Sequence, residues 1–188
     1  MLHRVRERVP DARLFVVGKG LFGEEEELFR LAAQSGLIIQ RDVSIPLSPC
    51  PPVSLSSPEA SADVLYAGWV PSDTLSTYFA QADVAIYPFD DTLVNRTKCA
   101  VKLRDLLAAG VPVVAEAVGQ NTEYIRHGET GWLVPPGDVP SFAGAVVRLL
   151  EDTHLRERLG QAAARDLRDR FAWDRLVEMV ERAYGVGR

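Results

Sequence analysis

The sequence predicts an α/β protein with a Rossmann-like, doubly wound parallel sheet. Five short runs rich in Val, Ile and Leu alternate along the chain with segments of helical spacing, which is the pattern of successive strand–helix units. Most of these runs show little alternation of polar and apolar residues, as strands do when both faces of the sheet are covered. The length of 188 residues, with 47% hydrophobic and 25% charged residues, suits a single soluble domain.

Each predicted element follows from its local sequence. The strands are expected at residues 14–17, 64–66, 84–87, 111–115 and 132–134. Apolar residues three and four positions apart predict helices at residues 24–33, 73–82 and 98–109. Ser72 or Asp73 is expected to cap the second of these helices, because a short polar side chain accepts a hydrogen bond from the first free N–H groups. Gly110 is expected to end the third, since glycine readily adopts the left-handed conformation that follows a helix.

Beyond residue 138 the sequence predicts only helices, so residues 139–188 are expected to be the helical part of one domain that spans residues 1–188. Three apolar stripes of helical spacing are expected to pack in the core. They consist of Phe142, Ala145, Val146, Leu149 and Leu150, then of Leu155, Leu159, Ala162 and Ala163, and last of Trp173, Leu176, Val177, Val180 and Tyr184. Residues 45–62, dominated by proline and serine, are expected to form an exposed loop outside any nucleotide site.

Composition and charge exclude several classes of protein. The net charge of -5 argues against a protein that coats nucleic acid. No apolar run approaches the roughly 20 residues that cross a bilayer, and the first residues lack the apolar segment of a signal peptide. The two cysteines lack the spacing of a metal site, and the three histidines are scattered. We therefore expect no bound metal and a reducing, cytoplasmic location.

Residues 18–23 read Gly-Lys-Gly-Leu-Phe-Gly, which matches the dinucleotide-binding pattern GxGxxG, and Asp42 stands near the position of a ribose-binding acid. That pattern works by placing a pyrophosphate at the positive N-terminus of the following helix. Here four glutamates, at positions 24 to 27, occupy the first helical turn and would repel a pyrophosphate. A tight strand-to-helix turn is the preferred interpretation, and a NAD-dependent oxidoreductase is the alternative.

Lys98, Lys102 and Asp105 are spaced four and three residues apart, which places them on one face of the third predicted helix. A basic pair near a helix N-terminus suits a diphosphate, and a carboxylate one turn later can accept hydrogen bonds from two ribose hydroxyls. These residues therefore suit a nucleoside-diphosphate site at the carboxyl ends of the strands. The same spacing also fits an exposed, salt-bridged face in which Lys102 pairs with Asp105 or its neighbours, and spacing alone favours neither interpretation.

Residues 66–138 carry a family resemblance. The segment Asp105-Leu-Leu-Ala-Ala-Gly110-Val-Pro112-Val-Val is followed by Gly119-Gln-Asn-Thr-Glu123-Tyr-Ile, and then by His127-Gly128, Thr130-Gly131 and Pro136-Gly137-Asp138. In this order and spacing, the segments resemble the C-terminal domain of GT-B glycosyltransferases, specifically the retaining group called glycosyl transferases group 1. Phe171-Ala-Trp173 is similar to the start of that family's final helix, and the resemblance covers residues 9–184 apart from the Pro/Ser loop.

The resemblance implies roles for four residues around the third predicted helix. Asp105 takes the place of an acid that binds the donor ribose. Lys102 and Lys98 stand where the diphosphate of the donor would be held. Thr97 stands where the family commonly has a glutamate that contacts the donor sugar, so the chain departs from the family pattern at this position, and no catalytic residue is assigned.

Two loops complete the donor site that the resemblance implies. The turn at Gly68 and Val70 resembles the place where backbone groups meet the base. Gly119, Gln120 and Asn121 resemble the loop whose backbone amides approach the donor. The nucleotide and the sugar are not specified by these residues.

The resemblance also implies an activity in carbohydrate biosynthesis. A full enzyme of this kind transfers a hexosyl or related group from a nucleoside-diphosphate sugar to an acceptor hydroxyl, and it does so by neutralising the leaving diphosphate and orienting the donor, without a cofactor or metal. The resemblance places the first strand of the domain and the N-terminal acceptor domain outside this chain, so the chain alone is expected to be inactive. A non-catalytic remnant of the fold is the alternative. For the full enzyme, the resemblance allows a peripheral association with membranes.

Overall fold

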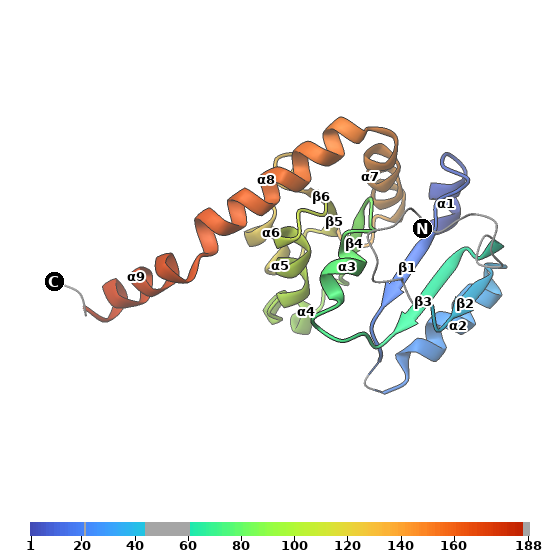
Figure 1. The fold of residues 1–188 in the computed structure, drawn as a ribbon, viewed down its shortest axis with the longest axis horizontal. Coiled ribbons are helices and arrows are strands. Elements are labelled where there is room, and N and C mark those ends of the chain that lie inside the picture. The colour runs from blue at the N-terminus through green and yellow to red at the C-terminus, as the bar shows by residue number, and fades with distance from the viewer. Residues whose placement is uncertain (21, 44–60, 186–188) are drawn as a thin grey trace. The chain divides into compact units, whose positions relative to one another are not determined.

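The computed structural model describes residues 1–20, 22–43 and 61–185 of the chain. The chain divides into two compact units, residues 2–82 and residues 83–188 together with Met1. Each unit contains a three-stranded sheet in which all paired strands are parallel, with helices beside it (Figure 1). The α/β class with parallel strands, predicted from the sequence, is therefore confirmed, and the strands are distributed between two sheets.

The unit of residues 2–82 has the strand order β1-β3-β2, with β1 at Leu14–Val17, β2 at Ile39–Arg41 and β3 at Val64–Gly68. Its helices are α1 (Leu2–Arg6), α2 (Glu24–Gln34) and α3 (Leu75–Phe79). Aromatic rings join the helices to the sheet. Phe29 of α2 meets Tyr66 of β3 edge to face at 5.1 Å, and Phe15 of β1 stacks on Tyr78 of α3 at 5.6 Å. These pairs bury large apolar areas and fix both helices against the strands.

The unit of residues 83–188 has the strand order β4-β5-β6, with β4 at Ala85–Tyr87, β5 at Val113–Glu116 and β6 at Trp132–Val134. Its helices are α4 (Leu93–Thr97), α5 (Val101–Ala108), α6 (Asn121–Tyr124), α7 (Val139–Glu151), α8 (Thr153–Phe171) and α9 (Trp173–Tyr184). All of β5 is buried, as the apolar run predicts for a central strand. α7 packs on β5 and β6, and α5 packs on α8, so that Leu103, Leu107, Leu149 and Leu159 form a core that is at most 1% exposed.

The predicted strands are present with small shifts at their ends, and one strand was not predicted. β2 has only three residues and contains Gln40 and Arg41 within it, so it lacks the apolar run that marks the other strands. It is held by its parallel pairing with β3, from Ile39 opposite Val64 to Arg41 opposite Tyr66. Pairing with a distant strand creates this element, and local sequence does not reveal it.

Two helical predictions are wrong at their starts. The helix expected at residues 98–109 begins at Val101, because Lys98 has an extended backbone with φ of -72° and ψ of 135°. The polar stretch before it contains α4, whose start is capped by Thr92 as its hydroxyl oxygen accepts a hydrogen bond from the Asn95 amide. Neither Ser72 nor Asp73 caps α3. A turn from Pro71 to Thr74 comes first, and Thr74 takes the capping position.

Other boundaries agree with the sequence. α5 ends at Ala108 with Ala109 as its C-cap, and Gly110 follows with φ of +74°, which is the expected glycine signal. α7 begins at a cap in which the Asp138 carboxylate accepts a hydrogen bond from the Ser141 amide. The Pro/Ser loop predicted at residues 45–62 lies outside the described residues except for its last two, of which Ala62 is buried.

The three C-terminal stripes have different outcomes. Most of the first two stripes are buried, on α7 and α8 respectively. The third stripe, on α9, was expected in the core, and this expectation is wrong because no residue of α9 is buried. Trp173 and Tyr184 are each 79% exposed. Helical periodicity identified the apolar face of α9, but it carries no information on whether another element covers that face.

Candidate functional site

The residues predicted to bind a donor fall in both units. Thr97, Lys98, Lys102, Asp105, Gly119, Gln120 and Asn121 belong to the unit of residues 83–188, and Gly68 and Val70 belong to the unit of residues 2–82. In the larger unit, the segments that carry them follow the carboxyl ends of β4 and β5. Ligands of parallel α/β sheets bind outside the carboxyl ends of the strands. This edge of the β4-β5-β6 sheet is the candidate site, and it is called the carboxyl edge below.

Lys102 and Asp105 lie on α5, about one turn apart. Lys102 is exposed and Asp105 is half-buried. The Asp105 Oδ1 atom lies 3.5 Å from Nη2 of Arg104, and both side chains are open to solvent, so this ion pair is weak. None of the ion pairs among the described residues involves Lys102. The ammonium of Lys102 is therefore available to an anion from solvent.

Lys98 does not share the face of Lys102 and Asp105, so the prediction of three residues on one helical face is wrong for this lysine. Lys98 follows α4 in an extended conformation, before α5 begins. Its Nζ atom lies 5.0 Å from the centroid of the Phe89 ring, at a distance suited to a cation–π contact. Phe89 in turn packs on Tyr87 with ring centroids 4.7 Å apart, and burial raises the pKa of Tyr87. The contact places a positive charge at the exit of β4.

Thr97 is exposed, and its hydroxyl donates to the backbone of its own helix. The acceptors are the carbonyl oxygens of Leu93 at 3.0 Å and Val94 at 3.3 Å. Thr97 thus completes the last turn of α4 and supplies no negative charge at a position where the family that the sequence resembles commonly has a glutamate.

The segment after β5 approaches both α4 and α5. Gly119 has φ of +50°, and a Cβ atom there would lie 2.7 Å from the Asn95 carbonyl oxygen, so only glycine fits. The side-chain oxygen of Gln120 accepts a hydrogen bond of 3.0 Å from the Ala100 amide, at the start of α5. Among the residues that the structure describes, the backbone amides of Gly119 and Gln120 donate no hydrogen bond. Successive free amides at a left-handed residue followed by a right-handed one form an anion-binding concavity.

Asn121, which was predicted in the same loop, supports the backbone. Its side chain is 0% exposed, and its Nδ2 atom donates a hydrogen bond of 2.9 Å to the Glu116 carbonyl oxygen. Its Oδ1 atom has no hydrogen-bond partner within the described residues. Asn121 therefore links the end of β5 to the start of α6 from inside the unit.

Glu116 is a candidate that the sequence analysis did not single out. It is the last residue of β5, and its side chain is 9% exposed. Its carboxylate accepts a hydrogen bond of 2.6 Å from the Phe89 amide and one of 2.8 Å from the Gly137 amide. A signal was present in the sequence, because a charged residue closes an apolar strand just before a glycine loop. Carboxylates are rarely buried unless they are paired or hydrogen-bonded, because burial removes their hydration.

In the smaller unit, Gly68 and Val70 stand at the exit of β3. Gly68 has φ of +67°, and its carbonyl oxygen accepts a hydrogen bond of 2.8 Å from the Gly18 amide. Val70 is buried, whereas Trp69 between them is 78% exposed. The backbone of this turn is therefore held by the exit of β1, and Trp69 is its accessible side chain.

The GxGxxG turn at residues 18–23 is occupied by its own glutamates. The Glu25 carboxylate accepts a hydrogen bond of 3.1 Å from the Gly20 amide, and the Glu24 carboxylate accepts one of 2.9 Å from the Phe22 amide. The Phe22 amide lowers the pKa of Glu24, so this carboxyl is ionised at neutral pH. The amides that would receive a pyrophosphate are thus already bonded to carboxylates, which argues against the dinucleotide-binding alternative.

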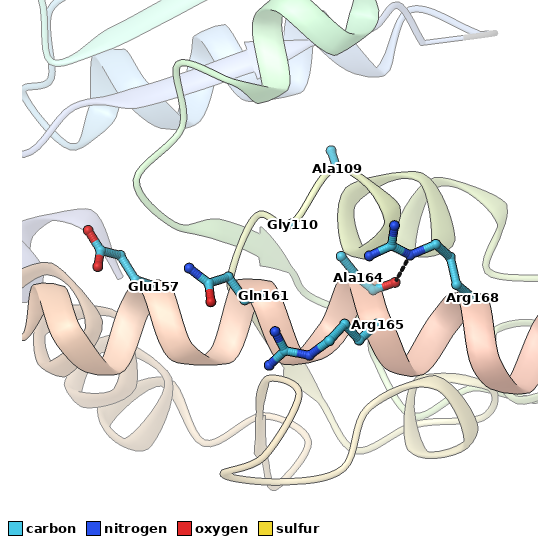
Figure 2. A pocket seen from close by; sticks show the side chains of 7 residues that line it. All are labelled: Ala109, Gly110, Glu157, Gln161, Ala164, Arg165 and Arg168. Carbon is cyan, nitrogen blue, oxygen red and sulfur yellow. Dashed lines mark hydrogen bonds between the residues drawn. The ribbon is translucent and has the colours of Figure 1, made fainter.

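A hollow of about 470 Å³ lies in the larger unit away from the carboxyl edge. Figure 2 shows that it lies between α8 and the end of α5, and that the side chains on α8 provide most of its polar groups. It is lined by Ala109, Gly110, Glu157, Gln161, Ala164, Arg165 and Arg168. None of the predicted donor-binding residues lines it, and it adjoins the C-terminal end of α5, whose partial charge is negative.

The described part of the chain contains no group of three or more His, Cys, Asp or Glu residues arranged to hold a metal ion. None of its helices combines the length and the apolar character that are needed to cross a bilayer.

Several sequence relatives of the chain are named as glycosyltransferases. The family model of glycosyl transferases group 1 matches residues 48–152. Phosphatidyl-myo-inositol mannosyltransferase of Mycobacterium leprae is 28% identical over 180 residues, which cover 96% of this chain and 39% of that protein. D-inositol 3-phosphate glycosyltransferase of Acidothermus cellulolyticus is 36% identical over 121 residues, which cover 64% of this chain and 25% of that protein. The chain spans less than half the length of these relatives.

Solved structures share the fold. HepE of Anabaena, in complex with UDP, matches 98% of this chain and 43% of its own with a TM-score of 0.67 and 20% sequence identity. The C-terminal domain of LpcC of Francisella tularensis, a glycosyl transferase group 1 family protein, matches 90% of this chain and 76% of its own with a TM-score of 0.62 and 16% identity.

Proposed function

The chain belongs to the glycosyl transferases group 1 family, and we propose that it binds the nucleoside-diphosphate sugar of such an enzyme at the carboxyl edge. The observation that carries the proposal is the pair of free amides at Gly119 and Gln120, in a segment that also contacts the start of α5 through Ala100. A diphosphate needs several donors and a positive charge, and these amides together with Lys102 provide both.

Each part of the donor is assigned to different groups. Asp105 accepts hydrogen bonds from the ribose hydroxyls, because it is the half-buried carboxylate of α5. Lys102 and Lys98 neutralise the diphosphate. Thr97 contributes no charge, so the contact to the sugar that a glutamate would make at this position is absent from the proposal.

The names of the matched proteins support this assignment. HepE was solved with UDP-glucose as well as with UDP, and the pneumococcal O-GlcNAc transferase GtfA was solved with UDP and GlcNAc. A nucleotide that carries a hexosyl group is therefore the class of donor that we propose. The mannosyltransferase of Mycobacterium leprae acts, by its name, on a phosphatidyl-myo-inositol, which supports a peripheral membrane association for the full enzyme.

The whole activity requires a second domain in this proposal. The acceptor hydroxyl would be held by an N-terminal domain, and the chain alone would bind the donor without transferring its sugar. Electrostatic stabilisation of the leaving diphosphate needs no cofactor or metal, and a cytoplasmic location fits the supply of nucleotide sugars.

Titration calorimetry of the chain with UDP, GDP and NAD tests the proposal. We expect UDP or GDP to bind more tightly than NAD, because the GxGxxG amides are occupied by glutamates. Tighter binding of NAD would contradict the proposal and favour the oxidoreductase alternative. Sugar transfer by the chain alone would contradict the assignment of the acceptor site to a second domain.

A further inference from the structure

We infer that Glu116 is a positioning residue of the donor site, which holds the exits of β4 and β6 in register with the loop after β5. The inference rests on the proposed function. Burial of the Glu116 carboxylate is energetically unfavourable. A carboxylate that is 9% exposed and forms no ion pair among the described residues loses most of its hydration, and only hydrogen bonds offset that loss.

The two hydrogen bonds of the Glu116 carboxylate join it to residues that are distant in sequence. Phe89 is 27 positions from Glu116 and Gly137 is 21 positions away, and each amide donates to a different carboxylate oxygen. Phe89 follows β4 and Gly137 follows β6, while Glu116 itself ends β5. One side chain therefore joins all three strand exits of the sheet. Hydrogen bonds to an ionised carboxylate are short and strong, which suits this bracing role.

The contacts continue from Phe89 to the groups assigned to the diphosphate. The Phe89 ring carries the Lys98 ammonium at 5.0 Å. The chain then runs to Ala100, whose amide is bonded to the Gln120 side chain. Asn121 returns to the Glu116 carbonyl oxygen. The contacts thus form a closed ring through Glu116 that contains Lys98 and Gln120, and Gly119 adjoins it in sequence.

Glu116 acts through this ring and does not touch the donor. Both of its carboxylate oxygens accept hydrogen bonds from backbone amides, and a carboxylate has no hydrogen-bond donor to offer an anionic diphosphate. Loss of the carboxylate would release the β4 and β6 exits. Lys98 would then be mobile and would hold the diphosphate of the donor less well. α5 and its Asp105 would be unaffected.

Glu116→Gln tests the inference, with Asp166→Asn as the matched control. The substitution keeps the side-chain length but presents an NH₂ group to one of the two amides, so one hydrogen bond is lost. Asp166 is an equally buried carboxylate of the same unit, but it pairs with the side chains of Arg126 and Arg170. Affinity for UDP and uridine is measured by calorimetry well below the melting temperature of both variants.

We expect Glu116→Gln to weaken UDP binding by about tenfold, as for the loss of one charged hydrogen bond. Uridine affinity should be unchanged, because uridine lacks the diphosphate. Asp166→Asn should lower the melting temperature and leave UDP affinity unchanged. Amide hydrogen exchange, measured without ligand, should be faster only in Glu116→Gln, at whichever of the Phe89 and Gly137 amides loses its hydrogen bond.

The outcomes separate this inference from the proposed function. If the unsubstituted chain binds neither UDP nor GDP, the proposed function fails and the inference fails with it. If the chain binds UDP and Glu116→Gln binds it equally well, the inference alone is overturned. An equal loss of UDP and uridine affinity would also overturn it, because general loosening of the unit would then explain the result.

Discussion

Asp105, the carboxylate proposed to bind ribose, forms a weak ion pair with its neighbour Arg104. Their closest atoms are 3.5 Å apart and both side chains are open to solvent. The carboxylate can therefore turn to a ligand at almost no cost, since exposed ion pairs contribute about 0–1 kcal/mol. The proposed role in binding ribose requires a carboxylate that is free to reorient in this way.

We expect Asp105→Ala to weaken UDP or GDP binding by about ten- to a hundredfold. A hydrogen bond to a charged group contributes about 1.5–3 kcal/mol, which corresponds to that range. Calorimetry measures the effect, and Asp169→Ala on the exposed side of α8 is the control. Unchanged affinity in a well-folded Asp105→Ala protein would remove the central support for the proposed site.

Lys102→Ala should act on another part of the ligand. Lys102 pairs with no acidic residue in the described part of the chain, so its ammonium is free to meet a diphosphate. We expect UDP affinity to fall while uridine affinity stays the same, and we expect added salt to diminish the difference because salt screens exposed charges. Equal losses for uridine and UDP, or a difference that persists in high salt, would assign Lys102 to another role.

Single residues were predictable from the sequence where the signal was local. The spacing of Lys102 and Asp105 is a property of one helix, and the structure keeps it. Lys98 was misplaced because its extended backbone depends on α4, which was not predicted. Glu116 was missed because its importance lies in Phe89 and Gly137, which are distant in sequence. Contacts of that kind leave no periodic signal.

At the scale of elements, α8 crosses the turn after α5 at a pair of glycines. A Cβ atom on Gly160 would overlap the carbonyl oxygen of Gly110, so the helix and the turn meet backbone to backbone. Gly144 in α7 is also within a helix, but a Cβ atom there meets nothing within 4 Å. Alanine substitutions at these two positions therefore distinguish the effect of packing from the effect of helix propensity.

Gly160→Ala should destabilise the protein and Gly144→Ala should stabilise it. Alanine favours a helix interior by about 0.5–1 kcal/mol relative to glycine. At residue 160 this gain is outweighed by an overlap with backbone, for which overpacking typically costs about 1–3 kcal/mol. Thermal unfolding of both variants gives the signs, and a stabilised Gly160→Ala protein would show that α8 does not approach Gly110 closely.

The exposed stripe of α9 gives a second prediction for an element. Val177 and Val180 are 45% and 54% exposed, so replacing both by serine should change the melting temperature little and should reduce self-association. Val146→Ser in α7, at 6% exposure, is the control and should destabilise strongly. Light scattering and thermal unfolding measure the two effects. A large loss of stability in the α9 variant would mean that its apolar face is packed in this chain.

Helices and strands that depend on their own sequence were predictable, whereas features that depend on contacts with distant segments were not. The apolar runs of β5 and β6 and the stripes of α7 and α8 identify them without reference to the rest of the chain. β2 needs β3 as its partner, and the failure of α9 to join the core depends on what lies beyond its own sequence. Periodicity predicts which face is apolar, whereas burial is a property of the tertiary structure.

For the whole molecule, the separation into two units leads to a prediction about unfolding. Each unit has its own sheet and its own apolar core, so we expect the units to unfold in separate transitions, outside the two-state approximation. Trp69 is in the smaller unit, and Trp132 is in the larger one. Variants that keep only one tryptophan each should therefore report different denaturation midpoints by fluorescence. Coincident midpoints, with equal calorimetric and van't Hoff enthalpies, would show one cooperative unit.

The class of fold was predictable at this scale because alternation of strands and helices is a global pattern of the sequence. The distribution of the strands between two sheets was not, since each apolar run is compatible with either sheet. Gly68 and Val70 belong to the smaller unit and Asp105 to the larger one, and sequence order does not reveal this assignment.

The glutamates that fill the GxGxxG turn have a consequence for evolution. The backbone of this turn already offers its amides in the arrangement that anions use, and Glu24 and Glu25 keep anions out by occupying it. A single base change converts a glutamate codon into one for alanine or glycine. Two such changes would vacate the amides of Gly20 and Phe22 without rebuilding the strand or the helix. Two substitutions therefore suffice to expose the amides of this turn, and the spacing of its glycines alone does not show whether a phosphate can reach them.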